Sequence, residues 1–193
     1  MARSFYQTKE INAANILNRA FNASYPAVDG KALIATDHVT KAGLTYSNAL
    51  ATPADLSEAA IEQTLIQIKQ ATNERGLRIS IMPRNLVVAV ENIFQANRIL
   101  HSNLRVGTDH NDLNAIKNMG ALPGECISWN YLTDPDAWFI TTDIEEGLVY
   151  QEREALEFDS DNEFNTKNAA FSGYERYVFD SVDPRGVYGS AGA

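Results

Sequence analysis

The chain has 193 residues and a formal net charge of −9, and its size allows one medium-sized domain with a substantial hydrophobic core. The acidic balance argues against a simple nucleic-acid-binding domain, which would present a basic face. A single cysteine, Cys126, excludes an internal disulfide and favours the cytoplasm. No apolar run approaches the roughly 18 residues that cross a bilayer, so we expect a soluble protein.

The first quarter of the chain predicts one helix followed by a long irregular segment. Residues 4–22 carry one apolar stripe at helical spacing, formed by Ala13, Ile16, Leu17, Ala20 and Phe21. Residues 24–48 lack a sustained pattern and contain Gly30 and Gly43. A loop of this length inside a domain is either functional or rests on something outside the chain.

The middle of the chain predicts helices and strands in alternation. Thr52 and Pro53 supply a helix cap and a first helical residue, and Gly76 can end that helix. In chain order we expect a helix over 52–73, strands over 77–82 and 86–90, and helices over 91–100 and 112–119.

Both tryptophans of the chain flank a turn. Residues 127–131 and 138–140 alternate between apolar and polar side chains, and the sequence Asp134-Pro135-Asp136 between them favours a turn. This pattern predicts a hairpin. The alternative interpretation is a small hydrolase in which Asp134 or Asp136 acts with His110. No third group is obviously associated with the two aspartates as an acid/base pair. Turn propensity already explains the spacing of the two aspartates.

Two long strand-like runs follow, over 148–158 and 171–182, with charged residues among the aromatic ones. Between Asp143 and Arg185 there are twelve acidic and four basic residues, so this segment holds −8 of the net charge. A two-stranded ribbon alone is only marginally stable in water. The ribbon must therefore pack on the rest of the chain or on another subunit.

The sequence contains no complete catalytic, cofactor or metal motif. The histidines lack the spacing of a helical metal site, and we expect surface or helix-cap roles for His38, His101 and His110. Cys126 has no nucleophile signature around it. Residues 159–163 begin like a calcium loop, but Phe164 stands where that loop requires glycine. We therefore predict no catalytic residue, no cofactor and no metal, and hence no enzyme.

Several segments, spread in order along nearly the whole chain, resemble parts of the major capsid proteins of tailed bacteriophages and prophages. Each pattern is weak alone, and the set is specific. The segments are NALATPADLSEAA (48–60), RILHSN (98–103), NDLNA (111–115), LTDPDAWF (132–139), ERY (175–177) and DPRGVYGS (183–190).

The resemblance implies an α+β chain with the Hong Kong 97-type capsid fold, which consists of a spine helix, an axial α/β domain and a long acidic C-terminal β-ribbon. Residues 1–25 and 145–193 would form the peripheral domain, and residues 26–144 the axial domain. The family also has an N-terminal arm and an extended loop before the spine helix. This sequence starts at that helix, so we expect a truncated fragment, a maturation product or a shortened natural form.

The function implied by the resemblance is structural. Copies of the subunit would form hexamers and pentamers of an icosahedral head that is assembled in the bacterial cytoplasm. The head would contain packaged DNA, bound without sequence specificity. Scaffold, portal and decoration proteins would be further partners. An encapsulin-like compartment that stores protein cargo is the alternative with the same fold.

Four charged residues are our candidates for contacts between subunits, because they lie among aromatic residues near the C-terminus, where interfaces favour Tyr and Arg. These residues are Arg153, Glu157, Arg176 and Arg185. Charge reversal at Arg185 is expected to impair assembly while leaving the melting of the monomer unchanged.

Overall fold

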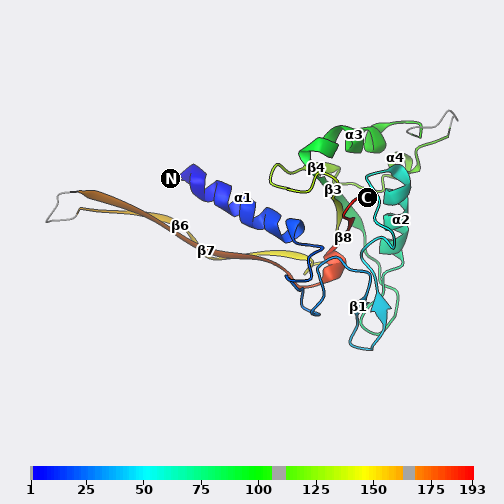
Figure 1. Ribbon diagram of the computed structural model, residues 1–193, viewed down its shortest axis with the longest axis horizontal. Coiled ribbons are helices and arrows are strands. Elements are labelled where there is room, and N and C mark those ends of the chain that lie inside the picture. The colour runs from blue at the N-terminus through cyan, green and yellow to red at the C-terminus, as the bar shows by residue number, and fades with distance from the viewer. Residues whose placement is uncertain (1, 106–111, 163–167) are drawn as a thin grey trace.

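The computed structural model describes residues 2–105, 112–162 and 168–193. It combines helices and strands, which confirms the predicted α+β class. A long two-stranded ribbon, with helix α1 (Ala2–Asn18) beside it, extends from one side of a body that contains the other helices and a four-stranded sheet (Figure 1).

The body is built on a sheet with the strand order β4-β3-β5-β8. The strands are β3 (Pro83–Val88), β4 (Cys126–Ser128), β5 (Trp138–Thr142) and β8 (Val187–Ser190). β4 runs parallel to β3, whereas β5 is antiparallel to both of its neighbours, β3 and β8. The last strand of the chain therefore returns from the ribbon and pairs with the middle of the sequence.

The predicted hairpin over residues 127–140 is wrong, because β3 lies between β4 and β5. Leu86 of β3 is opposite Cys126 on one side and Ile140 on the other. The chain does bend between the two strands, where the Asp136 backbone N–H donates to Asp134 Oδ1 at 3.1 Å. Turn chemistry thus predicted the bend correctly but could not identify the pairing partner.

Both faces of the sheet are covered, because successive residues of a strand point to opposite sides. One face presents Leu86, Val88, Trp138, Ile140 and Tyr188, which pack with Ile61, Ile68 and Ile99 of the helices. The other face presents Val87, Phe139 and Val187, which pack with Leu17, Ala20, Leu33 and Ile34. Full burial of each large apolar side chain stabilises the fold by about 1.5–3 kcal/mol, so this two-sided core holds the body together.

Helix α2 (Glu58–Lys69) begins later than the helix predicted from Thr52. The Ser57 side chain caps it by accepting the Ala60 N–H at 3.3 Å. The residues before the cap are held by the sheet instead, since the Ala54 N–H donates to Ser190 Oγ of β8. The serine is the better cap because the tertiary contacts of Ala54 keep the preceding turn out of the helix.

The remaining helix predictions are confirmed and one strand prediction is wrong. A 3₁₀ turn (Val90–Asn92) leads into α3 (Ile93–His101), and α4 (Ala115–Met119) is capped by Asn114. Residues 77–82 belong to no strand. They follow a turn in which the Asn73 side chain accepts the N–H groups of Arg75 and Leu77.

The two long strands are confirmed as an antiparallel ribbon of β6 (Leu148–Asn162) and β7 (Ala169–Ser181). The predicted irregular segment over 24–48 is confirmed as well, with only the short pair β1 (His38–Val39) and β2 (Thr45–Tyr46) in it. These two regions meet near the end of β7, where the 3₁₀ turn η2 (Pro184–Gly186) leads into β8.

Candidate subunit-contact surfaces

Helix α1 covers one face of the ribbon through polar and aromatic contacts. Lys9 Nζ lies 3.0 Å from Glu175 Oε2, and Asn12 Nδ2 donates to the Tyr177 hydroxyl at 2.9 Å. The hydrogen bond to Glu175 raises the pKa of the Lys9 ammonium. Near the helix N-terminus the Phe5 ring meets the Phe158 ring edge to face, with centroids 5.8 Å apart. This face of the ribbon is therefore occupied within the chain.

The opposite face of the ribbon is open to solvent. Residues of β7 alternate, so that Glu175, Tyr177 and Phe179 turn toward α1 while Tyr174, Arg176 and Val178 are exposed. Tyr174 is 54% exposed and Val178 50%. Exposed tyrosine, arginine and aliphatic side chains in one row are typical of protein interfaces, so this outer face is a candidate contact surface.

Three of the four predicted contact residues lie exposed on the ribbon. Arg176 is opposite Glu154 in the strand register, and Glu157 is opposite Tyr174. Arg153 lies at a register shift and lines a shallow groove together with Arg176 and Val178. The structure therefore brings Arg153 and Arg176 together, with Glu157 further along the same ribbon.

The fourth predicted residue, Arg185, is buried in its own chain. Its side chain is stacked on the Tyr46 ring, with 4.2 Å between the guanidinium carbon and the ring centroid. Nη2 lies 2.8 Å from Glu74 Oε1, and Nη1 lies 3.2 Å from Asp183 Oδ2. Only 4% of the residue is exposed. Arg185 is thus placed in the interior of the subunit and not on the outer surface where the sequence placed it.

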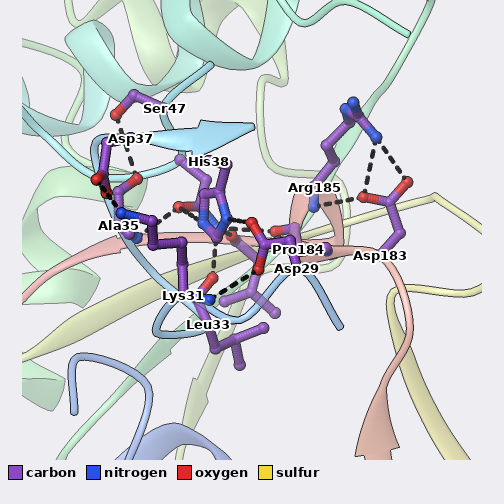
Figure 2. A network of polar contacts seen from close by, with 12 residues as sticks. Asp29, Lys31, Leu33, Ala35, Asp37, His38, Ser47, Asp183, Pro184 and Arg185 are labelled. Carbon is purple, nitrogen blue, oxygen red and sulfur yellow. Dashed lines mark hydrogen bonds and ion pairs between the residues drawn. The ribbon is translucent and has the colours of Figure 1, made fainter. Parts of the chain in front are cut away.

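Asn48 is the hub of a buried network of hydrogen bonds. Figure 2 labels its partners Leu33, Ala35, His38 and Pro184. Its side-chain nitrogen donates to the backbone carbonyl oxygens of Leu33, Pro184 and Val187 at 2.8–3.0 Å. Its side-chain oxygen accepts the Ala35 N–H at 2.9 Å. One amide therefore joins the irregular segment to the chain that leaves the ribbon.

His38 extends this network and is fully buried, which corrects the expectation of a surface or cap role. Its Nδ1 lies 2.6 Å from Asp29 Oδ2, and its Nε2 lies 3.0 Å from Asn48 Oδ1. The imidazole also stacks on the Tyr46 ring, 5.1 Å between centroids. Tyr46 thus contacts both His38 and Arg185, so the two buried groups share one aromatic support.

The titration of several groups reflects these contacts. The Lys41 backbone N–H and the Arg185 guanidinium hold the pKa of the Glu74 carboxyl below its usual value. Burial raises the pKa of the Tyr46 phenol, and it raises that of Tyr188 to about 12. Burial also raises the pKa of the Cys126 thiol, which disfavours the reactive thiolate.

Other residues considered for chemistry stay apart. Asp134 and Asp136 lie at the exposed bend before β5, and His110 lies outside the described residues, as does Phe164 in the calcium-like loop. Within residues 2–105, 112–162 and 168–193 there is no group of three or more His, Cys, Asp or Glu side chains able to hold a metal ion. The helices of this part of the chain are all too short or too polar to span a bilayer.

Sequence reasoning missed Asn48, Glu74 and the pair Lys9–Glu175. Asn48 and Pro184 are 136 positions apart, and Lys9 and Glu175 are 166 positions apart. Asn48 and Pro184 each lie in a segment that resembles phage capsid proteins, but neither segment predicts that the two residues are in contact.

An α+β body with a long ribbon whose outer face is exposed has the features of a subunit of a larger assembly. The chain matches the family described as phage capsid protein over residues 1–190, and it belongs to that family. The resemblance to phage capsid proteins is thereby confirmed, and the chain is a structural protein of the virion.

Other comparisons are distant. No curated protein matches the chain. Among solved structures, the crystal structure of a virus-like particle from Pyrococcus furiosus aligns with a TM-score of 0.44 and 12% identity. The alignment covers 74% of this chain and 55% of that chain, so this chain spans little more than half the length of that structure.

Proposed function

We propose that the chain is the major shell subunit of a phage head and has the Hong Kong 97-type fold. Helix α1 takes the place of the spine helix. Residues 1–25 and 145–193 form the peripheral domain, and residues 26–144 form the axial domain. Because β8 pairs with β5, the two domains share one sheet and are rigidly joined at that edge.

The observation that carries this proposal is the ribbon. Two strands of 15 and 13 residues extend beyond the body, and α1 covers only one of their faces. A two-stranded ribbon is marginally stable without further packing, and its outer face exposes aromatic and charged side chains. Neighbouring copies of the subunit complete this surface.

Arg153, Glu157 and Arg176 are the residues that we propose to contact a neighbour directly. All three are exposed, and none forms an ion pair with another residue that the structure describes. Arg185 contributes indirectly, because it holds the base of the ribbon to Tyr46 and Glu74. It therefore fixes the direction in which the ribbon leaves the body.

In the assembled head the subunits form hexamers and pentamers of an icosahedral shell that encloses DNA. The net charge of −9 supports contact with DNA that is weak and independent of sequence. Scaffold, portal and decoration proteins are further proposed partners, and assembly takes place in the bacterial cytoplasm.

Size-exclusion chromatography with light scattering, followed by negative-stain microscopy of the largest species, tests the proposal. We expect rings of five or six subunits, or closed particles. A chain that stays monomeric as its concentration rises, or that stops at a two-fold dimer, contradicts the proposal, because heterologous contacts are needed to build rings.

A further inference from the structure

We infer that the distal part of the ribbon of one copy docks on a cationic double turn of a second copy. The distal ribbon is defined as residues 154–161 of β6 and 169–174 of β7. The double turn is defined as residues 40–44 and 73–78. This inference rests on the proposed function and names the two surfaces that meet.

The distal ribbon is acidic and aromatic. It carries Glu154, Glu157, Asp159 and Asp161 and contains no lysine or arginine. Phe158 and Phe171 are about half or more exposed, at 48% and 64%. Its contact with α1 is near the helix N-terminus, where Phe5 meets Phe158 and lies over Gly173. The ribbon continues past that end of α1 (Figure 1), so this part has little support from its own chain.

The double turn has the complementary character. The Lys41 N–H donates to Glu74 Oε2 at 2.8 Å, and Leu44 packs against Gly76, so the two turns form one surface. Glu74 is its only acidic residue, and Arg185 pairs with it from inside. The outward charge is therefore positive.

The cations of this surface have side chains available for a partner. Lys41, Arg75 and Arg78 are exposed, and none of them forms an ion pair with another residue that the structure describes. Leu44 and Leu77 lie among them, and Leu77 is 63% exposed. The surface thus offers both charge and apolar area, which matches the carboxylates and phenylalanine rings of the distal ribbon.

The two surfaces lie at opposite ends of the subunit. The ribbon runs away from the body, whereas the turn over residues 40–44 joins β1 to β2 on the far side (Figure 1). A distal ribbon cannot reach the double turn of its own chain. The contact therefore joins two different surfaces of two copies. When it repeats head to tail from copy to copy, it propagates into rings or open chains.

The buried network fixes the angle between the two surfaces. Arg185, which follows the ribbon, is paired with Glu74 in the double turn at 2.8 Å. Tyr46, directly after the other turn, lies under the same guanidinium. Because these groups connect the base of the ribbon to both turns, the docking direction is set inside each subunit before it meets a second copy.

Charge exchange tests the inference. One variant carries Arg75→Glu and Arg78→Glu, a second carries Glu154→Lys and Glu157→Lys, and a third combines all four changes. Like charges brought together at an interface oppose association. We expect each of the first two variants to raise the concentration needed for assembly by about tenfold or more, and the third to recover most of this loss.

The matched control is Arg84→Glu with Arg98→Glu, which makes the same charge change at exposed residues of β3 and α3, outside the double turn. It should assemble like the unmodified chain, and circular dichroism should show all variants folded. If the unmodified chain assembles but the combined variant recovers nothing, the pairing of these surfaces is wrong while the proposed function stands. If the unmodified chain stays monomeric, both are wrong.

Discussion

Arg185 and Arg176 lie nine positions apart in the acidic C-terminal region, but Arg185 is buried and Arg176 is exposed. Arg185 is buried between Glu74, Asp183 and the Tyr46 ring. The change Arg185→Glu removes the guanidinium and brings a third carboxylate to the same place. Breaking a buried ion pair costs about 3–5 kcal/mol. We expect the free energy of unfolding of the monomer, measured by urea denaturation, to fall by about 3 kcal/mol or more.

Arg176→Glu is the matched control for this prediction, because it makes the same charge change on the exposed face of the ribbon. It places a carboxylate opposite Glu154 in the strand register, and a cross-strand pair of side chains changes stability by only about 0.2–1 kcal/mol. The monomer should therefore unfold almost as before, while association weakens. Similar losses of monomer stability in the two variants would contradict the assignment of Arg185 to the interior.

Glu74 predicts an acid-sensitive contribution to stability. Its carboxyl has a pKa in the folded chain below that of the unfolded chain, about 4.3. The ionised Glu74 carboxylate therefore stabilises the folded state above about pH 4.3. This stabilisation is lost as the pH falls through the lower pKa that the carboxyl has in the folded chain. We expect the free energies of unfolding of the unmodified chain and of Glu74→Gln, measured by urea denaturation, to become equal as the pH falls from 5 to 2.5. Curves that stay parallel would contradict this role.

At the residue level, exposure can be predicted where it depends on local sequence, whereas the contacts of the exposed residues with a second subunit stay a prediction. The exposed positions of Arg153, Glu157 and Arg176 follow from their place in a polar, alternating strand. Arg185 lies instead in the 3₁₀ turn Pro184–Gly186, and it is paired with Glu74, 111 positions away. Distant partners of this kind leave no periodic signal, so the interior role of Arg185 could not be predicted.

At the level of elements, Gly173 allows α1 to dock on the ribbon. A Cβ atom at this position would lie 2.7 Å from Phe5 Cε2 and 3.1 Å from Phe158. Glycine within a strand is less stable than alanine because it loses more conformational freedom on folding. If only the strand were affected, Gly173→Ala would therefore raise stability. We instead expect Gly173→Ala to displace the Phe5 ring and loosen the first turns of α1, seen as faster amide hydrogen exchange there.

Ser172→Ala is the control for this substitution, since Ser172 is exposed and adjacent on β7. It should leave hydrogen exchange in α1 unchanged. Because the distal end of a Phe side chain can move, the global cost of Gly173→Ala should be at the low end of the 1–3 kcal/mol typical of overpacking. Unchanged exchange in both variants would show that Phe5 does not hold the helix to the ribbon.

Elements with a strong local pattern were predicted well from sequence. In the ribbon, in α3 and in the first helix, apolar residues recur at the spacing of a strand or a helix, and the existence of these elements is confirmed. The pairing of strands was not predictable in the same way. β4 and β5 are close in sequence and separated in space by β3, because the apolar faces of Leu86 and Val87 pack better in the centre of the sheet than at an edge. Local turn signals contain no information about that choice.

At the scale of the whole molecule, the subunit is a packed body with an extended arm, the β6–β7 ribbon. The core covers both faces of the sheet, and the buried network of Asn48, His38 and Arg185 joins the arm to the irregular segment. This arrangement places an acidic surface at one end and a cationic surface at the other. From sequence, the long irregular segment was expected either to be functional or to rest on something outside the chain. In the structure it is held in part by this internal network.

The opposite charges at the two ends predict that association depends on salt. The Debye length falls from about 10 Å at 0.1 M ionic strength to about 3 Å at 1 M, and exposed ion pairs contribute about 0.2–1 kcal/mol each. Several such pairs at one contact amount to roughly a tenfold change in affinity. We therefore expect light scattering to show that the concentration needed for assembly rises by about this factor when sodium chloride is raised over that range.

The variant Arg75→Gln with Arg78→Gln should assemble less well at low salt and respond less to added salt. An assembly that strengthens with salt equally in both chains would indicate a contact driven by apolar burial, and it would contradict the charge pairing of ribbon and double turn.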